Sequence, residues 1–302
     1  MHVQRLDALL AYPDVLHRKL ARSHGERLAP SLDDPAEDAE WFHRVGDEVA
    51  VRYLERRFIE LERAVVAEQV REVPTDARGF LSWFDELKAS GPGQGDPLFP
   101  WLARHASLEQ MRWFLGQEVA GEAGFEDLVA LAQLKLPAQP KLELARNYWD
   151  EMGQGNEQAM HGPMLDVLKR QLALDDGAVV WESLALGNLM VGLATSRQYA
   201  YQALGALGVI ELTAPGRAEQ VNAGLKRLGI DGATRRYFAL HATLDVRHSQ
   251  SWVAEVFRPI VASDPRIAPR LAEGALLRLR AGARCFERYR ATLWAQPLAH
   301  SA

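Results

Sequence analysis

The amino-acid sequence predicts an all-α protein. Between its breaks, nearly every segment carries apolar residues at three- and four-residue steps, which is the spacing of one face of an α-helix. Alternating runs rich in β-branched residues and bounded by turn residues, which would indicate strands, are hard to find. Glycine and proline clusters predict breaks between helices at 28–38, 89–100, 134–141, 153–155, 212–217 and 229–234.

The stretch 89–100 is the one predicted domain boundary. It divides the chain into an N-terminal helical extension, 1–95, and a larger helical domain, 96–302. The alternative is an ordinary loop inside one domain, because a short linker does not prove that two cores fold independently. With 302 residues and an apolar fraction of 48%, the chain can fill one large core or a core with a lobe.

The composition of the chain limits the classes of partner that we expect. The formal charge of -5 and the isoelectric point near 6.0 argue against nucleic acid, which usually requires an excess of Lys and Arg on one face. The start of the chain has no uninterrupted apolar stretch behind a basic head, so export is not expected. The most apolar stretch, 183–194, is shorter than the roughly 18 to 20 residues that a membrane span needs. We therefore expect no membrane partner, and a homodimer is compatible with the sequence.

The single cysteine, Cys285, excludes an internal disulfide and a thiolate metal cluster. Because it also fits a reducing compartment, the cytoplasm is the expected location.

The most informative segment spans 234–261. His241, Asp245 and His248 are spaced i, i+4, i+7, so they share one helix face, which Phe238 and Trp252 extend. Polar groups on an aromatic face are costly to bury unless something compensates them. Hydrogen bonds to other helices or a solvated face would explain a single histidine, whereas three potential ligands on one stripe favour a metal ion.

Further ligands must come from other segments. Glu151 and His161 flank a Gly-Gln-Gly interruption, and ten residues of straight helix would separate them by about 15 Å. A break at 153–155 could fold that distance back, so that both side chains face one ion.

Glu211 follows a long apolar run. It could cap the helix, pair with a base such as Arg217, or bind the metal. Glycines in and near that run, Gly205 among them, indicate close approach of helices or of a ligand, and close packing is the commoner reason. Imidazole and carboxylate ligands without thiolate suit iron, manganese or zinc, and a carboxylate-rich pair of sites favours redox iron or manganese.

The order E-x9-H at 151–161, then Glu211, then H-x3-D-x2-H at 241–248, resembles the heme-oxygenase-like diiron oxidases and oxygenases, also called iron-containing redox enzymes. The stretches DPLFPWLARHASLEQMRWFLGQE, KLELARNYWDEMGQG and MHGPM also resemble that family, so the likeness covers roughly 96–262. It implies a heme-oxygenase-like bundle of about seven core helices carrying an N-terminal helical extension.

The resemblance also implies a metal centre. Glu151, His161 and His248 would hold one iron, and Glu211, His241 and Asp245 would hold the other. Two Fe, or an Fe/Mn pair, would then react with O2 as co-substrate and oxidise a small organic molecule. Family members N-oxygenate amines or cleave C–C bonds, so the ligands do not define the reaction.

Glu118 and Glu122 lie on the helix face of Phe114 and Phe125. Either carboxylate could be an extra ligand or could orient a ligating histidine. The alternative is that they lie on the helix surface or pair with Arg112.

Three other readings compete with a diiron enzyme. The same architecture hosts heme oxygenases and thiamine-degrading enzymes, and the latter use a cysteine nucleophile. Cys285 lies beyond the core motifs, which argues against that chemistry. The third reading is a non-catalytic partner-binding protein in which the six side chains form a buried polar network.

Overall fold

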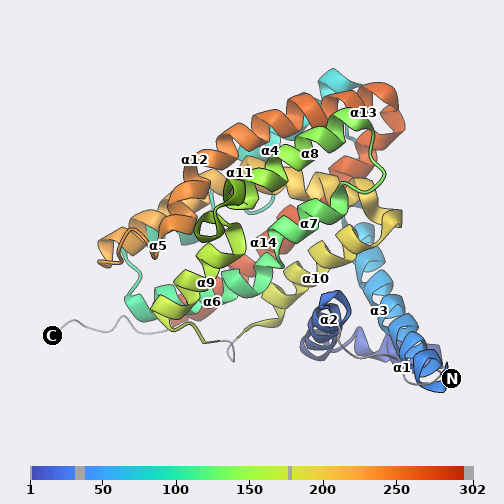
Figure 1. Ribbon diagram of the computed structural model, residues 1–302, viewed down its shortest axis with the longest axis horizontal. Helices are drawn as coiled ribbons and strands as arrows, with labels where there is room; N and C mark the ends of the chain where they lie inside the picture. The colour runs from blue at the N-terminus through green and yellow to red at the C-terminus, as the bar shows by residue number, and fades with distance from the viewer. Residues whose placement is uncertain (1, 31–37, 176–178, 296–302) are drawn as a thin grey trace.

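The computed structural model describes residues 2–30, 38–175 and 179–295 and confirms the all-α prediction, since these ranges contain no strand (Figure 1). The helices are α1 (His2–Leu9), α2 (Pro13–Leu28), α3 (Asp38–Arg71), α4 (Ala77–Ser90), α5 (Leu98–Arg104), α6 (Leu108–Glu122), α7 (Phe125–Ala132), α8 (Ala138–Glu151), α9 (His161–Leu172), α10 (Trp181–Thr195), α11 (Ala200–Arg227), α12 (Arg236–Ser251), α13 (Arg258–Ser263) and α14 (Ala268–Ala295). A π-helical turn (Trp252–Phe257) joins α12 to α13.

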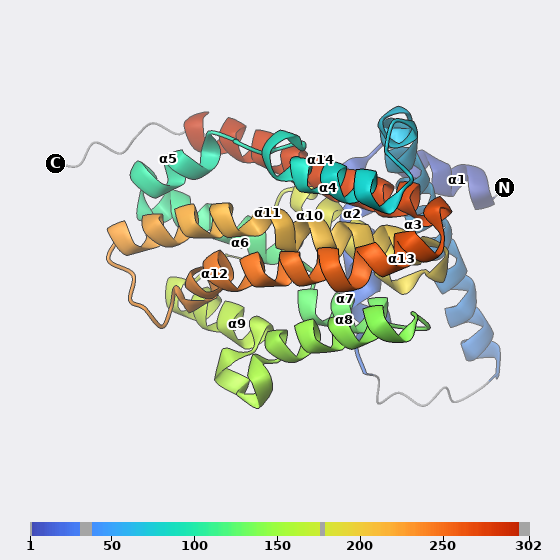
Figure 2. The ribbon, with the colours of Figure 1, turned by 90° about the horizontal axis from the view of Figure 1, so that it is seen from above.

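Helix α11 is the centre of the bundle. It packs along α12 and α14, and it also contacts α5 and α10 (Figure 2). The N-terminal helices join the same assembly, because α2 packs on α10 and α3 packs on α14. One cluster of buried apolar side chains extends from Leu16 to Leu293. The division of the chain at residue 96 stays a prediction, and any boundary there lies between helices that share this core.

Most predicted breaks fall between helices: 89–100, 134–141, 153–155 and 229–234 do so, while part of 28–38 lies outside the described residues. The break predicted at 212–217 is wrong, because α11 runs through it with Pro215 inside. Pro215 has no N–H to donate to the Glu211 carbonyl, which usually ends or bends a helix. Here α11 stays helical on both sides of the proline because buried residues hold it in the core. Leu212 lies before the proline and Val221 after it.

Two glycines let α11 and α14 cross in backbone contact. A Cβ added at Gly205 would lie 1.8 Å from the Leu271 carbonyl oxygen, and one at Gly274 would lie 1.8 Å from the Gln202 carbonyl oxygen. No side chain fits at either position unless a helix moves. This crossing therefore fixes the position of α11, which carries Glu211 one and a half turns further on.

The Gly-Gln-Gly interruption folds the chain back, as the sequence predicts. Helix α8 ends at Glu151, two 3-10 turns follow, and α9 begins at His161. Gly153, Gln154 and Gly155 all have positive φ, at 61°, 53° and 86°. A Cβ at Gly153 would also lie 2.6 Å from the carbonyl carbon of Ala159. The glycines at 153 and 155 thus allow a reversal that most residues would resist.

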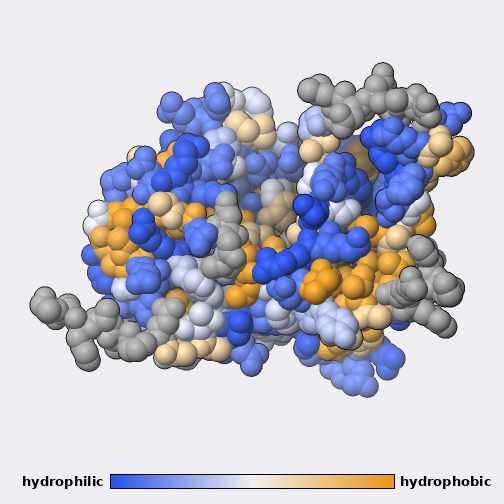
Figure 3. Space-filling view, turned by 90° about the horizontal axis from the view of Figure 1, so that it is seen from below, coloured by the Kyte–Doolittle hydropathy of each residue, from blue (hydrophilic) through white to orange (hydrophobic). Residues whose placement is uncertain are grey.

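Figure 3 shows a largely hydrophilic surface on which apolar side chains form separate patches. Among the described residues, no helix combines the length and the apolar character needed to cross a membrane.

The close contact between α11 and α14 leads to a prediction about the stability of glycine variants. We expect Gly205→Ala to lower the free energy of unfolding by about 1–3 kcal/mol, the usual cost of overpacking, because the new methyl group meets backbone. The matched control is Gly216→Ala in the same helix, where a Cβ would meet nothing within 4 Å. It should be neutral or stabilising by up to about 1 kcal/mol. Urea denaturation of both variants checks the pair, and equal stabilities would contradict the steric account.

Candidate metal centre

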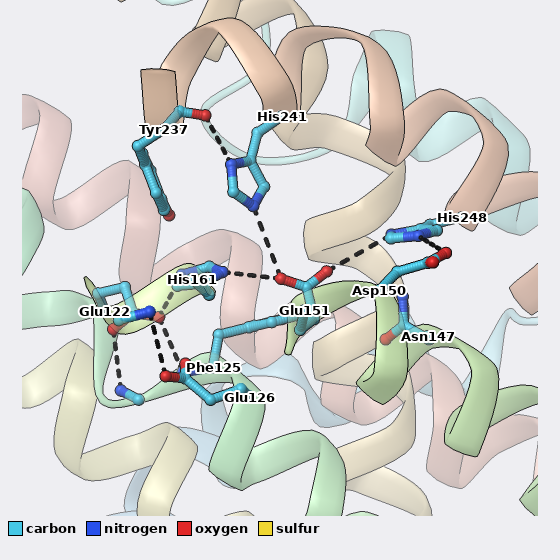
Figure 4. A network of polar contacts seen from close by, with 12 residues as sticks. Glu122, Phe125, Glu126, Asn147, Asp150, Glu151, His161, Tyr237, His241 and His248 are labelled. Atoms are coloured by element: carbon cyan, nitrogen blue, oxygen red, sulfur yellow. Dashed lines mark hydrogen bonds and ion pairs between the residues drawn. The ribbon is translucent and has the colours of Figure 1, made fainter. Parts of the chain in front are cut away.

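The six predicted ligands converge from four helices, and Figure 4 shows Glu151 with the three histidines. Helix α12 supplies three of them on one face, α11 supplies one, and the α8–α9 reversal supplies the last two. All six side chains are buried, with exposed fractions between 1% and 7%. They are Glu151, His161, Glu211, His241, Asp245 and His248. Their common location agrees with the sequence prediction, and their role as ligands stays a prediction.

The Glu151 carboxylate lies at the middle of this cluster. His161 Nδ1 is 2.8 Å from Glu151 Oε2. His241 Nε2 is 3.7 Å from the same oxygen, and His248 Nδ1 is 3.6 Å from Oε1. Three imidazoles on two helices therefore face one carboxylate, whose two oxygens point toward different histidines (Figure 4).

The potential ligand atoms form three groups: one contains Glu122, Glu126 and His161, and the other two share Glu151. Of these two, one contains Glu151, His161 and His241, and the other contains Glu151, Glu211 and His248; in each, all three atoms lie within 4.8 Å of one another. His248 Nδ1 is 3.4 Å from Glu211 Oε2. Compared with the division that the family resemblance implies, His241 and His248 exchange places.

Neighbouring groups orient two of the rings. His241 Nδ1 donates to the Tyr237 carbonyl oxygen at 2.7 Å, so its Nε2 faces Glu151. His248 Nε2 lies 3.1 Å from Asp150 Oδ2, so its Nδ1 faces Glu151 and Glu211. A hydrogen bond on the outer nitrogen that fixes the tautomer and the ring angle is the usual arrangement for metal-binding histidine.

The inward-facing atoms lack hydrogen-bond partners. Among the described residues, buried atoms without a partner include His241 Nε2, His248 Nδ1 and Asp245 Oδ1. Another is His161 Nε2, which lies 2.8 Å from Glu122 Oε1 without good hydrogen-bond direction. Such atoms are costly to bury, and a divalent cation would satisfy several of them together. The donor set of imidazoles and carboxylates fits iron or manganese.

The charged groups of the cluster strongly shift one another's pKa values. Burial favours the neutral His161 ring, but Glu122 and Glu151 outweigh burial and raise its pKa well above the usual range. Burial likewise opposes protonation of His248, yet Glu211 and Asp150 raise its pKa to about 9. Burial, reinforced by Glu211 and Glu151, raises the pKa of Asp245 well above its usual value. Protons thus occupy positions that a metal ion would take.

Glu122 is the seventh group at the cluster. Its carboxylate accepts from the backbone N–H groups of Gly124 and Phe125 at 2.9 and 2.8 Å, and it approaches His161 from the side opposite Glu151. It therefore caps the start of α7 and also faces the cluster. Arg112 donates instead to the Leu172 carbonyl, so it is not the partner of Glu122. Glu126 lies nearby and accepts from Gly162 N at 3.2 Å.

A cavity of about 140 Å³ adjoins the cluster. Five predicted ligands line it, with His248 outside, and so do Glu118, Glu122 and apolar side chains that include Leu115, Leu186 and Met190. Pockets for drug-sized ligands are typically about 300–1,000 Å³. The space suits a small molecule and is too small for a porphyrin, which disfavours heme binding in this conformation.

The thiol is poorly suited to act as a nucleophile. Cys285 is buried and donates to the Glu182 carbonyl oxygen. Burial, together with the Glu118 carboxylate, raises its pKa to about 12, so little thiolate forms near neutral pH. This disfavours the thiamine-degrading chemistry.

Sequence reasoning missed several groups at the site. Asp150 precedes Glu151 and holds His248, and Asn147 donates to Glu211 Oε1 at 2.9 Å. Both lie on the last turns of α8, at positions one and four before Glu151, and that spacing to a predicted ligand was the only available signal. No residue pattern could have indicated the role of the Tyr237 carbonyl, because a backbone acceptor has no residue signature.

Together, fold and site define an all-helical protein with a buried imidazole and carboxylate centre suited to metal ions. The chain belongs to the iron-containing redox enzyme family, whose sequence model matches residues 112–283. The matched region contains all six predicted ligands. A search of curated proteins finds no match.

Metal binding should be coupled to proton release. In the metal-free protein the pKa of His161 lies well above its usual value and that of His248 is raised to about 9, and each ring must lose its proton before it can bind a metal ion. We therefore expect at least about two protons to be released per chain at pH 7, and tighter metal binding as the pH rises toward 9. Titration calorimetry in buffers of different ionisation enthalpy measures this number. Metal binding without proton release would contradict these protonation states.

Proposed function

We propose that the chain is a non-heme diiron oxidase or oxygenase that uses O2 to oxidise a small organic substrate. The observation that carries the proposal is the set of inward-facing atoms on His241, His248 and Asp245, which are buried without hydrogen-bond partners around one carboxylate. Two iron ions, or an iron and a manganese ion, would satisfy that set. Membership of an iron-containing redox family supports the choice of iron.

The distances support one allocation of ligands. His161 and His241 would bind the first ion, and Glu211 and His248 the second. Glu151, with one oxygen toward each group, would bridge the two ions. Asp245 and Glu122 are the further carboxylates available at the cavity.

When bound, two ferrous ions would supply two of the four electrons that reduce O2, and oxidation of the substrate would supply the other two. The residues of this chain hold the ligand side chains in place and line the cavity in which the substrate would bind. Tyr237 and Asp150 hold the rings of His241 and His248 in place. The cavity would hold the substrate beside the predicted ligands. The apolar side chains of its wall would contact the short carbon skeleton of a substrate such as an amine or a carboxylic acid. The substrate would be oxidised at nitrogen or at carbon.

Loss of a ligand should remove iron and activity together. We expect His161→Ala and His248→Ala each to lower bound iron after anaerobic reconstitution and to abolish iron-dependent O2 consumption, because each ring belongs to a different ligand group. Elemental analysis and an oxygen electrode measure the two effects.

His43→Ala is the matched control. His43 is exposed on α3 and lies far from the cluster in sequence, so iron content and O2 uptake should stay unchanged. Full iron occupancy in both ligand variants would refute the assignment.

A further inference from the structure

Two arginines line the same cavity as the metal ligands. Arg217 projects from α11, and Arg278 projects from α14. Buried guanidinium groups are rare without a paired anion, because an uncompensated charge loses its hydration. Within the ranges that the structure describes, neither arginine forms a hydrogen bond or an ion pair with a predicted metal ligand, although the charge of Arg217 acts on Asp245.

Neither guanidinium has an anionic partner in the described part of the chain. No Asp or Glu oxygen there lies within 4.0 Å of either group. Arg217 donates to the Thr213 hydroxyl at 3.2 Å and lies over the rings of Phe99 and Phe286, 5.9 and 5.6 Å from their centroids. Arg278 Nε is buried without any hydrogen-bond partner.

The two arginines also repel each other. Burial, and after it the charge of Arg278, lowers the pKa of Arg217 to about 10. Burial lowers the pKa of Arg278 as well. Glu118 is a nearby carboxylate, but burial raises its pKa, which weakens it as a counter-charge.

The formal charges of the residues that line the cavity also favour an anionic substrate. Five carboxylates line it, from Glu118, Glu122, Glu151, Glu211 and Asp245, against the two arginines. Two divalent ions at the ligand groups would leave the cavity with one positive charge in excess. The excess is one unit with all five carboxylates ionised and larger if Glu118 is protonated, so it favours an anionic substrate.

We propose that Arg217 and Arg278 bind the carboxylate of the substrate, so that the substrate is a small monocarboxylate. The inference rests on the proposed function, since it places the rest of the molecule beside the metal ligands. A planar carboxylate can accept paired hydrogen bonds from guanidinium groups. A cavity of about 150 Å³ holds a benzene molecule, so a cavity of about 140 Å³ suits a substrate of about six non-hydrogen atoms with its carboxylate included.

The test is a binding comparison by titration calorimetry on protein loaded anaerobically with ferrous iron. The probes are butanoate and pentanoate, each against its neutral amide. We expect at least one carboxylate to bind about tenfold or more tighter than its amide, because a hydrogen bond to a charged group is the stronger kind. Equal affinities, or no binding of either carboxylate, would overturn the inference without any variant.

Variants locate the binding group. Arg217→Met and Arg278→Met keep an unbranched side chain and should each reduce the preference for carboxylate about tenfold. The matched control is Arg280→Met, on the same helix and outside the residues that line the cavity, which should keep the preference. A preference retained in both cavity variants would mean that the anion binds the metal ions instead, and would refute the role of the arginines. Thermal unfolding shows whether each variant is folded.

The result also separates this inference from the proposed function. Iron bound without a preference for carboxylate would leave the diiron assignment intact and remove the arginine site. If no iron binds, the diiron assignment fails, and the same comparison on the metal-free protein decides the inference: a preference lost in Arg278→Met supports it, and no preference overturns it.

Discussion

A carboxylate that is removed from water must be matched by positive charge, and Glu151 lies in the interior where the surrounding helices supply that match. Burial alone would raise its pKa, but contacts with His161 and His241 outweigh burial and hold the pKa well below the usual range. In the metal-free protein, protons on His161 and His248 provide compensating charge. Metal ions would provide the same positive charge and would also bind the inward-facing atoms that lack hydrogen-bond partners. The cluster is therefore suited to metal binding and not to packing alone.

Local backbone features bring the partners to Glu151. The reversal at Gly153–Gly155 places His161 opposite the end of α8. The close crossing at Gly205 and Gly274 fixes α11, and α11 in turn carries both Glu211 and Arg217 to the cavity. The predicted ligand Glu211 and the two arginines therefore depend on the position of α11, so a shift of that helix would disturb both groups.

Helical periodicity made much of this arrangement predictable. The α12 stripe follows from a period of 3.6 residues, and the approach of Glu151 and His161 follows from glycines that permit a reversal. The pairing of His241 and His248 with their carboxylates was not predictable, because it depends on the rotation of α12 against α8 and α11. The break expected at Pro215 was wrong because burial along α11 outweighs one lost hydrogen bond. The meeting of Arg217 and Arg278 depends on the α11–α14 crossing, which no local pattern encodes.

The measurement that tests this account most directly is an anaerobic titration with ferrous iron, followed by removal of free metal and elemental analysis of the protein. The account predicts that binding saturates at two irons per chain, because Glu151 lies between two ligand groups. A folded chain that retains no iron would contradict it, and the inward-facing atoms would then be a buried polar network without a metal ion.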